Sequence, residues 1–181
     1  TSTDGSKWLV TGGTLESPGI VYLAGVDGAQ PRRILAEHDA LDEFNVARAE
    51  PITWKGADNW TIEGILTYPL GYQAGQKVPM ILQVHGGPFG RFSANWNASA
   101  QIWAARGYAV LQGNPRGSSG RTLAFGAANQ NDWGGKDFVD IMKGVDQVIK
   151  MGVADSTQMA VMGGSYGGFM TFWTVTQTPR F

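Results

Sequence analysis

Cysteine is absent from this 181-residue sequence, which also lacks long hydrophobic runs and a strong net charge. Without cysteine the chain has no disulfide framework, thiolate zinc site or cysteine nucleophile, which agrees with a reducing, cytoplasmic compartment. Apolar stretches such as residues 78–84 are far shorter than the roughly 20 residues that cross a bilayer, so no membrane contact is expected. The chain has fourteen Lys and Arg residues and fifteen Asp and Glu residues, so no basic surface for nucleic acid is expected either.

Histidine is scarce too, and the sequence predicts neither a metal nor a cofactor. His38 and His85 are far apart, and no HExxH pattern or Asp-rich loop accompanies them. The glycine-rich segment 163–168 has serine where a dinucleotide fingerprint needs its second glycine. Segment 134–136 lacks the preceding glycine of a phosphate-binding loop.

Glycine is abundant. The chain has 26 glycines, about 14% of its residues and roughly twice the usual frequency. They often occur in pairs and follow no Gly-x-y period, which indicates tight backbone turns rather than a low-complexity sequence.

The first 45 residues have the pattern of a small antiparallel sheet. Short strands are predicted at 7–11, 20–24 and 32–35, separated by turn residues. One blade of a β-propeller has this pattern. Residues 38–59 lack a clear period and are the predicted linker.

The remainder alternates between strand and helix patterns, which predicts an α/β fold with a parallel sheet and covering helices. Strands are expected at 60–68, 78–84, 108–112 and 159–162. Helices are expected at 97–106, 138–149 and 169–177. Asp137 and Asp140 favour the start of the second helix because negative charge is stabilised there. The polar segment 113–134 is interpreted as either a functional loop or a disordered one.

Residues 163–167, Gly-Gly-Ser-Tyr-Gly, match the GxSxG turn that presents a nucleophilic serine between a strand and a helix. The glycines two residues away on either side are needed because side chains would clash in so tight a turn. The predicted strand before and helix after this turn favour Ser165 as a nucleophile. A glycine-rich turn with an inert serine is the alternative.

A second motif, His85-Gly86-Gly87-Pro88, directly follows the buried strand 78–84. Acyl transfer needs donors for an oxyanion, and α/β-hydrolases take one from the residue after the nucleophile and one from this loop. These donors would be the amide of Tyr166 and an amide of the Gly86-Gly87 pair, with Gly87 favoured. His85 is expected to shape the loop, because the base follows the nucleophile in this fold.

Four segments together resemble the prolyl oligopeptidase family of serine peptidases, especially its acylaminoacyl-peptidase and dipeptidyl-peptidase branch. They are HGGPFG at 85–90, NPRGSSG at 114–120, NDWGGKD at 131–137 and GGSYGG at 163–168. The resemblance covers roughly residues 50–181. It implies that residues 46–181 form the N-terminal half of an α/β-hydrolase domain. Residues 1–45 would be the last antiparallel blade of a β-propeller.

The resemblance also implies roles for individual residues. Ser165 matches the acyl-enzyme nucleophile, Tyr166 and Gly87 match oxyanion-hole positions, and His85 and Gly86 lie in the active-site loop. Short peptides are the implied substrate, and no cofactor is needed. The family places its triad Asp and His well beyond the nucleophile helix, so these 181 residues alone are expected to be inactive.

Two other functions stay open. A GxSxG turn does not distinguish ester from amide cleavage, so a carboxylesterase or lipase of the same fold is one alternative. A non-catalytic propeller-hydrolase protein used for binding is the other. HGGP rather than HGGG, together with the blade-like N-terminus, favours the peptidase. A homo-oligomer of the full-length protein is compatible with each.

Overall fold

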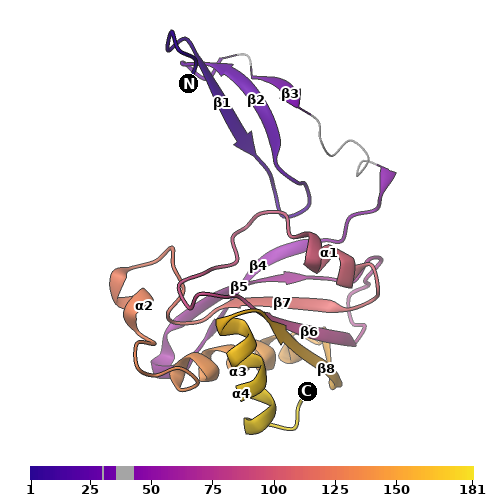
Figure 1. The fold of residues 1–181 in the computed structure, drawn as a ribbon. Coiled ribbons are helices and arrows are strands. Elements are labelled where there is room, and N and C mark those ends of the chain that lie inside the picture. Colours follow the sequence, from indigo (N-terminus) through magenta and orange to yellow (C-terminus); the bar gives the residue numbers. More distant parts are fainter. Residues whose placement is uncertain (30, 36–42) are drawn as a thin grey trace.

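A computed structural model describes residues 1–29, 31–35 and 43–181 of the protein. It contains a three-stranded sheet near the N-terminus and a five-stranded sheet formed by later residues. Figure 1 shows the smaller sheet standing apart from a body of strands and helices.

The smaller sheet consists of β1 (Lys7–Gly12), β2 (Ile20–Gly25) and β3 (Arg32–Leu35), paired antiparallel in that order. These strands confirm the three that the sequence predicts. Every residue of β1 is exposed, and Leu9 retains 60% of its accessible surface. The sheet therefore has little core of its own among the described residues, and its place in a propeller stays a prediction.

The larger sheet has the order β4-β5-β7-β6-β8. Its strands are β4 (Ala49–Lys55), β5 (Thr61–Thr67), β6 (Val78–Val84), β7 (Ala109–Asn114) and β8 (Ala154–Gly163). Strand β6 lies parallel to both β7 and β8, whereas β5 pairs antiparallel with β4 and β7. The predicted parallel sheet is thus confirmed for β7, β6 and β8, and the complete sheet is mixed.

The predicted linker at 38–59 is wrong for most of its length. Residues 38–42 lie outside the described ranges, whereas β4 pairs with β5 along its whole length and a 3-10 turn, Ala57–Asn59, follows it. Pro51 weakens the strand pattern in the sequence. It is tolerated because β4 is an edge strand of this sheet, where one row of amides needs no partner.

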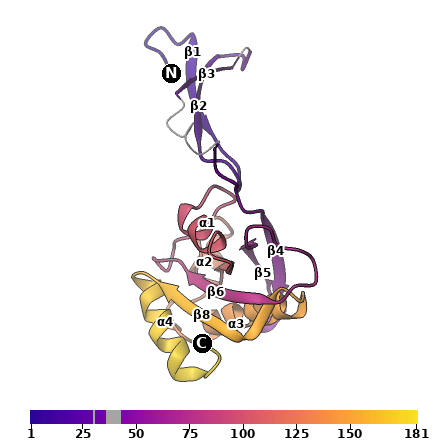
Figure 2. The ribbon, with the colours of Figure 1, turned by 90° about the vertical axis from the view of Figure 1, so that its right-hand side faces the viewer.

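Four helices accompany the larger sheet: α1 (Ala98–Ala104), α2 (Leu123–Ala127), α3 (Lys136–Lys150) and α4 (Tyr166–Gln177). Figure 2 shows α1 on one side of the sheet and α3 and α4 on the other. Helix α2 lies inside the segment 113–134, so its interpretation as disordered is wrong. Helix α4 begins three residues earlier than predicted, directly after Ser165. No helix in the described ranges is long and apolar enough to span a bilayer.

A continuous hydrophobic core joins the sheet to the helices. Strand residues Leu66, Leu82 and Leu111 belong to the same buried cluster as Val145 and Val148 of α3. Because β7, β6 and β8 are parallel neighbours, their carboxyl ends share one edge of the sheet. In open α/β sheets, ligands bind at this edge.

Candidate active site

Three loops meet at the carboxyl edge of the parallel strands. Residues 85–88 follow β6, residues 115–118 follow β7, and residues 164–165 connect β8 to α4. The structure thereby brings together the two motifs that the sequence singles out, the loop at 85–88 and the turn at 163–167. In the sequence, 77 residues lie between His85 and Gly163.

The turn at Ser165 has an unusual backbone conformation. Ser165 has φ 57° and ψ −122°, a positive φ that non-glycine residues rarely adopt. Ser165 is exposed and directly precedes α4. A strained, exposed serine between a strand and a helix is the geometry of a nucleophile turn.

The two glycines of the motif are required by space. A Cβ atom added to Gly163 would lie 2.6 Å from the carbonyl oxygen of Val84, and one added to Gly167 would lie closer still to that oxygen. By contrast, a Cβ at Gly164 would meet nothing within 4 Å. The GxSxG spacing therefore follows from the close approach of this turn to the end of β6.

The loop 85–88 lies directly against the turn. A Cβ on Gly86 would lie 3.5 Å from Cβ of Ser165. Gly87 has φ +124°, and a Cβ there would collide with the amide nitrogens of Phe89 and Gly90. Gly86 thus allows the backbone of this loop to run close to Ser165, whereas Gly87 allows the tight turn within the loop itself.

The amides of Gly87 and Tyr166 are available to a ligand. Within the part of the chain that the structure describes, neither amide donates to a backbone acceptor. Gly87 is exposed, and Tyr166 is the first residue of α4, whose amide has no partner inside the helix. The first amides of a helix favour negative charge, as an oxyanion requires.

His85 is buried and engaged on both ring nitrogens. Its Nδ1 lies 2.8 Å from the carbonyl oxygen of Gly86, and its Nε2 lies 2.9 Å from Oγ of Ser118. The carbonyl can only accept, so Nδ1 carries the proton. The hydroxyl of Ser118 donates to the carbonyl oxygen of Pro115 over 2.6 Å, and its Oγ is also the contact of Nε2. Burial lowers the pKa of His85. The ring therefore joins the loop after β6 to the loop after β7.

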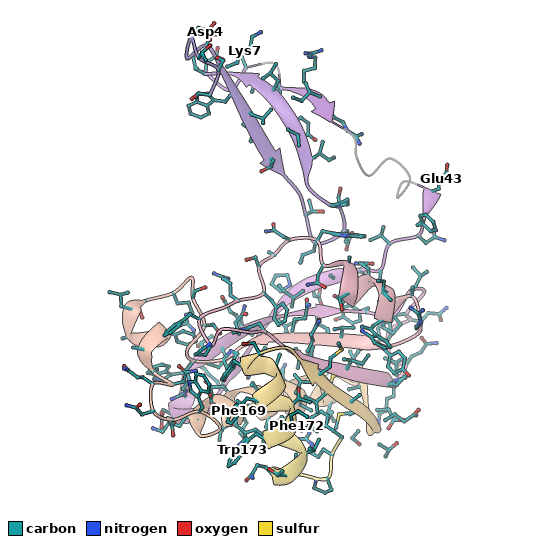
Figure 3. All side chains as sticks on the ribbon, in the orientation of Figure 1. Asp4, Lys7, Glu43, Phe169, Phe172 and Trp173 are labelled. Carbon is teal, nitrogen blue, oxygen red and sulfur yellow. The ribbon has the colours of Figure 1, made fainter. Side chains whose placement is uncertain are left out.

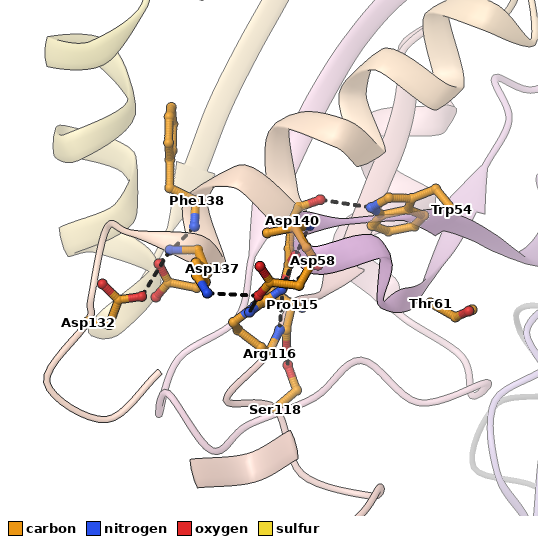
Figure 4. A network of polar contacts seen from close by, with 12 residues as sticks. Trp54, Asp58, Thr61, Pro115, Arg116, Ser118, Asp132, Asp137, Phe138 and Asp140 are labelled. Carbon is orange, nitrogen blue, oxygen red and sulfur yellow. Dashed lines mark hydrogen bonds and ion pairs between the residues drawn. The ribbon is translucent and has the colours of Figure 1, made fainter. Parts of the chain in front are cut away.

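Three charged residues near the site are buried, which the sequence does not predict, although it places Asp137 and Asp140 near a helix start and Arg116 in a family motif. Asp137 and Asp140 are fully buried, and Arg116 is almost so. Figure 4 shows these side chains in one polar network at the start of α3. A sequence signal existed: Asp137 falls on the same helical face as Ile141 and Val148, so an acidic residue interrupts an apolar stripe.

Asp137 contacts the residue that follows Ser165. The hydroxyl of Tyr166 donates to Oδ2 of Asp137 over 2.6 Å. Burial, followed by the nearby carboxylate of Asp137, raises the pKa of Tyr166, so its hydroxyl stays protonated. Burial also raises the pKa of Asp137.

A depression beside the loop is open to a ligand. It is lined by Pro88, Phe89, Ala127, Gln130, Asn131 and Trp133. The ring of Trp133 packs edge-on against that of Tyr166, with centroids 5.2 Å apart. Aromatic residues continue along α4, where Figure 3 labels Phe169, Phe172 and Trp173. Among the described residues, no group of three or more His, Cys, Asp or Glu side chains could hold a metal ion.

Comparison with known proteins shows that the chain is similar to peptidases. A sequence profile described as the prolyl oligopeptidase family matches residues 93–181. The chain is 34% identical over 182 residues to dipeptidyl aminopeptidase BIII of Pseudoxanthomonas mexicana, covering 97% of this chain and 26% of that protein. It is 38% identical over 156 residues to the uncharacterized peptidase YuxL of Bacillus subtilis, covering 85% of this chain and 24% of that protein.

Solved structures agree with these sequence matches. An acylaminoacyl peptidase of Pyrococcus horikoshii superposes with a TM-score of 0.86 at 27% identity, covering 97% of this chain and 28% of that one. The chain thus spans between 24% and 28% of the length of these three proteins. The larger sheet and its helices have the α/β-hydrolase fold of such neighbours.

Proposed function

Because the chain belongs to the prolyl oligopeptidase family of serine peptidases, we propose that the natural protein containing it hydrolyses short peptides through an acyl-enzyme on Ser165. One observation carries this proposal: Ser165 occupies a strained, exposed turn with Gly86, the residue before Gly87, directly against it. A nucleophile and a candidate oxyanion donor thus lie side by side.

The proposed reaction uses three groups of this chain. Oγ of Ser165 attacks the peptide carbonyl carbon and passes its proton to a base, while the carbonyl oxygen becomes an oxyanion. The amides of Tyr166 and Gly87 donate to this oxyanion. Collapse expels the amine, which takes up the proton, and water then hydrolyses the ester. Loss of one such donor costs about 10²- to 10³-fold in rate.

We assign the base to a residue other than His85. Both of its ring nitrogens are engaged, with Gly86 and with Ser118. A serine hydroxyl without a base is a weak nucleophile. The proposed base therefore lies elsewhere in the natural protein, and these 181 residues by themselves would be inactive.

Short peptides are the proposed substrates. The relatives bear names of dipeptidyl and acylaminoacyl peptidases. An acylaminoacyl peptidase 28% identical to this chain was solved in complex with Z-Gly-Gly-Phe-chloromethyl ketone, a peptide derivative. In this chain the depression bordered by Phe89 and Trp133 would take an apolar side chain of the peptide.

The test is active-site labelling of the natural protein with a fluorophosphonate, together with hydrolysis of peptide p-nitroanilides and p-nitrophenyl esters. Ser165→Ala is expected to abolish labelling and both hydrolyses. Ser119→Ala, a substitution of an exposed serine, is the matched control and should retain them. Labelling that persists in Ser165→Ala would contradict the proposal. Cleavage of esters without amides would favour the esterase.

A further inference from the structure

The backbone amide of Tyr166 belongs to the proposed site, whereas its side chain forms a buried hydrogen bond elsewhere. Its amide is a proposed oxyanion donor, whereas its ring is buried with only 3% of the residue exposed. The hydroxyl at the far end of that ring donates to Asp137 of α3 over 2.6 Å. A single buried hydrogen bond thus connects the residue after the nucleophile to a different helix.

The carboxylate of Asp137 is itself fixed. Its Oδ1 accepts from the amide of Gly134 over 2.9 Å and from the amide of Phe138 over 2.7 Å. Its Oδ2 accepts from Tyr166. A carboxylate that accepts several hydrogen bonds in a buried position has little freedom to move, because each lost bond leaves a polar group unsatisfied.

The N-terminal part of α3 is anchored by a second aspartate, one turn after the helix begins. Asp140 Oδ2 accepts from Nε of Arg116 over 2.8 Å and from its amide over 3.0 Å. Asp140 Oδ1 accepts from the amide of Ala57 over 2.8 Å. Figure 4 shows this ion pair beside Asp137. Asp137 therefore stands on a turn that is connected to two other loops of the body.

Helix α4 is attached to the same region at a second point. Nε1 of Trp173 donates to the carbonyl oxygen of Gly134 over 2.9 Å. No side chain caps the start of α4 at Ser165. The side chains of Tyr166 and Trp173 thus join this helix to the start of α3 by two hydrogen bonds, in addition to its packing on β8 and β6.

We propose that Asp137 is a positioning residue of the oxyanion hole: by holding the hydroxyl of Tyr166, it sets the direction of the Tyr166 amide next to the strained Ser165. This inference rests on the proposed function. Strain at Ser165 favours rotation of the adjacent peptide, and the bond to Asp137 opposes that rotation. Because the oxyanion exists only in the transition state, loss of the bond lowers kcat rather than raising KM.

The test compares Tyr166→Phe, Asp137→Asn and the double variant in the natural protein. Tyr166→Phe removes one oxygen and keeps the ring and the amide. Asp146→Asn is the matched control, because Asp146 lies on the same helix, half exposed, and pairs with Arg180 at the surface. Fluorophosphonate titration counts active sites, so that kcat is expressed per competent molecule and partial misfolding does not lower it.

We expect kcat per titrated site to fall about 10- to 100-fold in each single variant, with KM within about twofold. The double variant should be no slower than the slower single variant, because both changes act on the same bond between Tyr166 and Asp137. Affinity for a peptidyl trifluoromethyl ketone, whose tetrahedral adduct carries an anionic oxygen, should fall by the same factor as kcat/KM. Asp146→Asn should match the unmodified protein.

Two results would overturn the inference in distinguishable ways. If the unmodified protein shows no Ser165-dependent labelling or hydrolysis, the proposed function fails and the inference with it. If the unmodified protein is active but Tyr166→Phe keeps kcat and inhibitor affinity, the inference alone fails. Should Asp137→Asn not fold, Tyr166→Phe decides the question without it.

Discussion

The turn at 163–167 and the loop at 85–88 border the same candidate site, yet they are held in shape by different means. The turn is fixed by exclusion, because Gly163 and Gly167 leave no room for a side chain next to Val84. The loop is fixed by attraction, through the hydrogen bonds of the His85 ring. The turn therefore depends on the absence of side-chain atoms at two glycines, whereas the loop depends on the presence of hydrogen-bond partners.

This difference decides how each segment responds to mutation. An added methyl group should disrupt the turn at once, since backbone atoms of β6 cannot move aside cheaply. The loop should instead respond to the loss of a partner, in proportion to the hydrogen bonds that are removed. The following experiments separate the two, from the largest expected effect to the smallest.

The largest effect is expected from Gly167→Ala. Its Cβ would collide with the carbonyl group of Val84, so the turn could not keep Ser165 in place. We expect kcat/KM and the rate of fluorophosphonate labelling to fall by about 10³-fold or more. Gly168→Ala is the control: it lies in the same helix, and its Cβ would make only an ordinary contact of 3.6 Å.

Both substitutions replace glycine by alanine inside α4, so they gain the same helix propensity of about 1 kcal/mol. Any difference in activity between them therefore reports the collision with β6. Equal activities in the two variants would contradict fixation by exclusion.

A smaller effect is expected from Ser118→Ala in the loop after β7. Ser118 is buried, and its Oγ lies within hydrogen-bonding distance of Nε2 of His85 and of the carbonyl oxygen of Pro115. Its removal leaves buried polar groups unsatisfied, so the free energy of unfolding should fall by about 1–3 kcal/mol. Urea titration measures this change.

The neighbouring exposed residue provides the comparison. Ser119→Ala should change the free energy of unfolding by no more than about 0.5 kcal/mol. If the two variants were equally stable, the His85 contact would not hold the loop, and the contrast with the turn would disappear.

The sequence predicts the turn at 163–167 better than it predicts the hydrogen bonds that hold the loop at 85–88. The difference between steric exclusion and hydrogen bonding explains why. Exclusion leaves a local pattern, because Gly163 and Gly167 are two residues from Ser165. Hydrogen-bond partners leave none, since His85 and Ser118 are 33 residues apart. The role of Asp140 is hidden in the same way, because its partner Arg116 lies 24 residues away.

The fold follows the same rule. Strand β6 is predicted because it is a short, largely apolar run, and helix α3 because its apolar residues follow the helical period. Strand β7 and helix α1 are also predicted, close to their observed bounds. Strand β4 is missed because Pro51 interrupts its pattern, and its register with β5 depends on contacts that only the folded chain makes. Helix α2 is missed because it has only five residues and lies in a polar segment.

The smallest effect concerns acid. Burial lowers the pKa of His85 below its ordinary value of 6.5, so as the pH falls through about 6.5 the unfolded chain binds a proton that the folded chain does not. Proton binding therefore stabilises the unfolded state relative to the folded state. The free energy of unfolding should decrease toward lower pH by at most about 1.4 kcal/mol per pH unit. Within the turn 163–167 the one titratable side chain is that of Tyr166, whose raised pKa keeps its hydroxyl protonated throughout this range.

Urea titrations of the unmodified protein and of His85→Gln between pH 7.5 and 5.5 measure this contribution. Asp137 and all other titratable groups are common to both chains, so their effects cancel in the difference. We expect the stability advantage of the unmodified protein over His85→Gln to shrink as the pH falls, because only the unmodified protein loses stability through His85. An advantage that stays constant would mean that His85 titrates alike in the folded and unfolded chains, and the loop would then be as insensitive to acid as the turn.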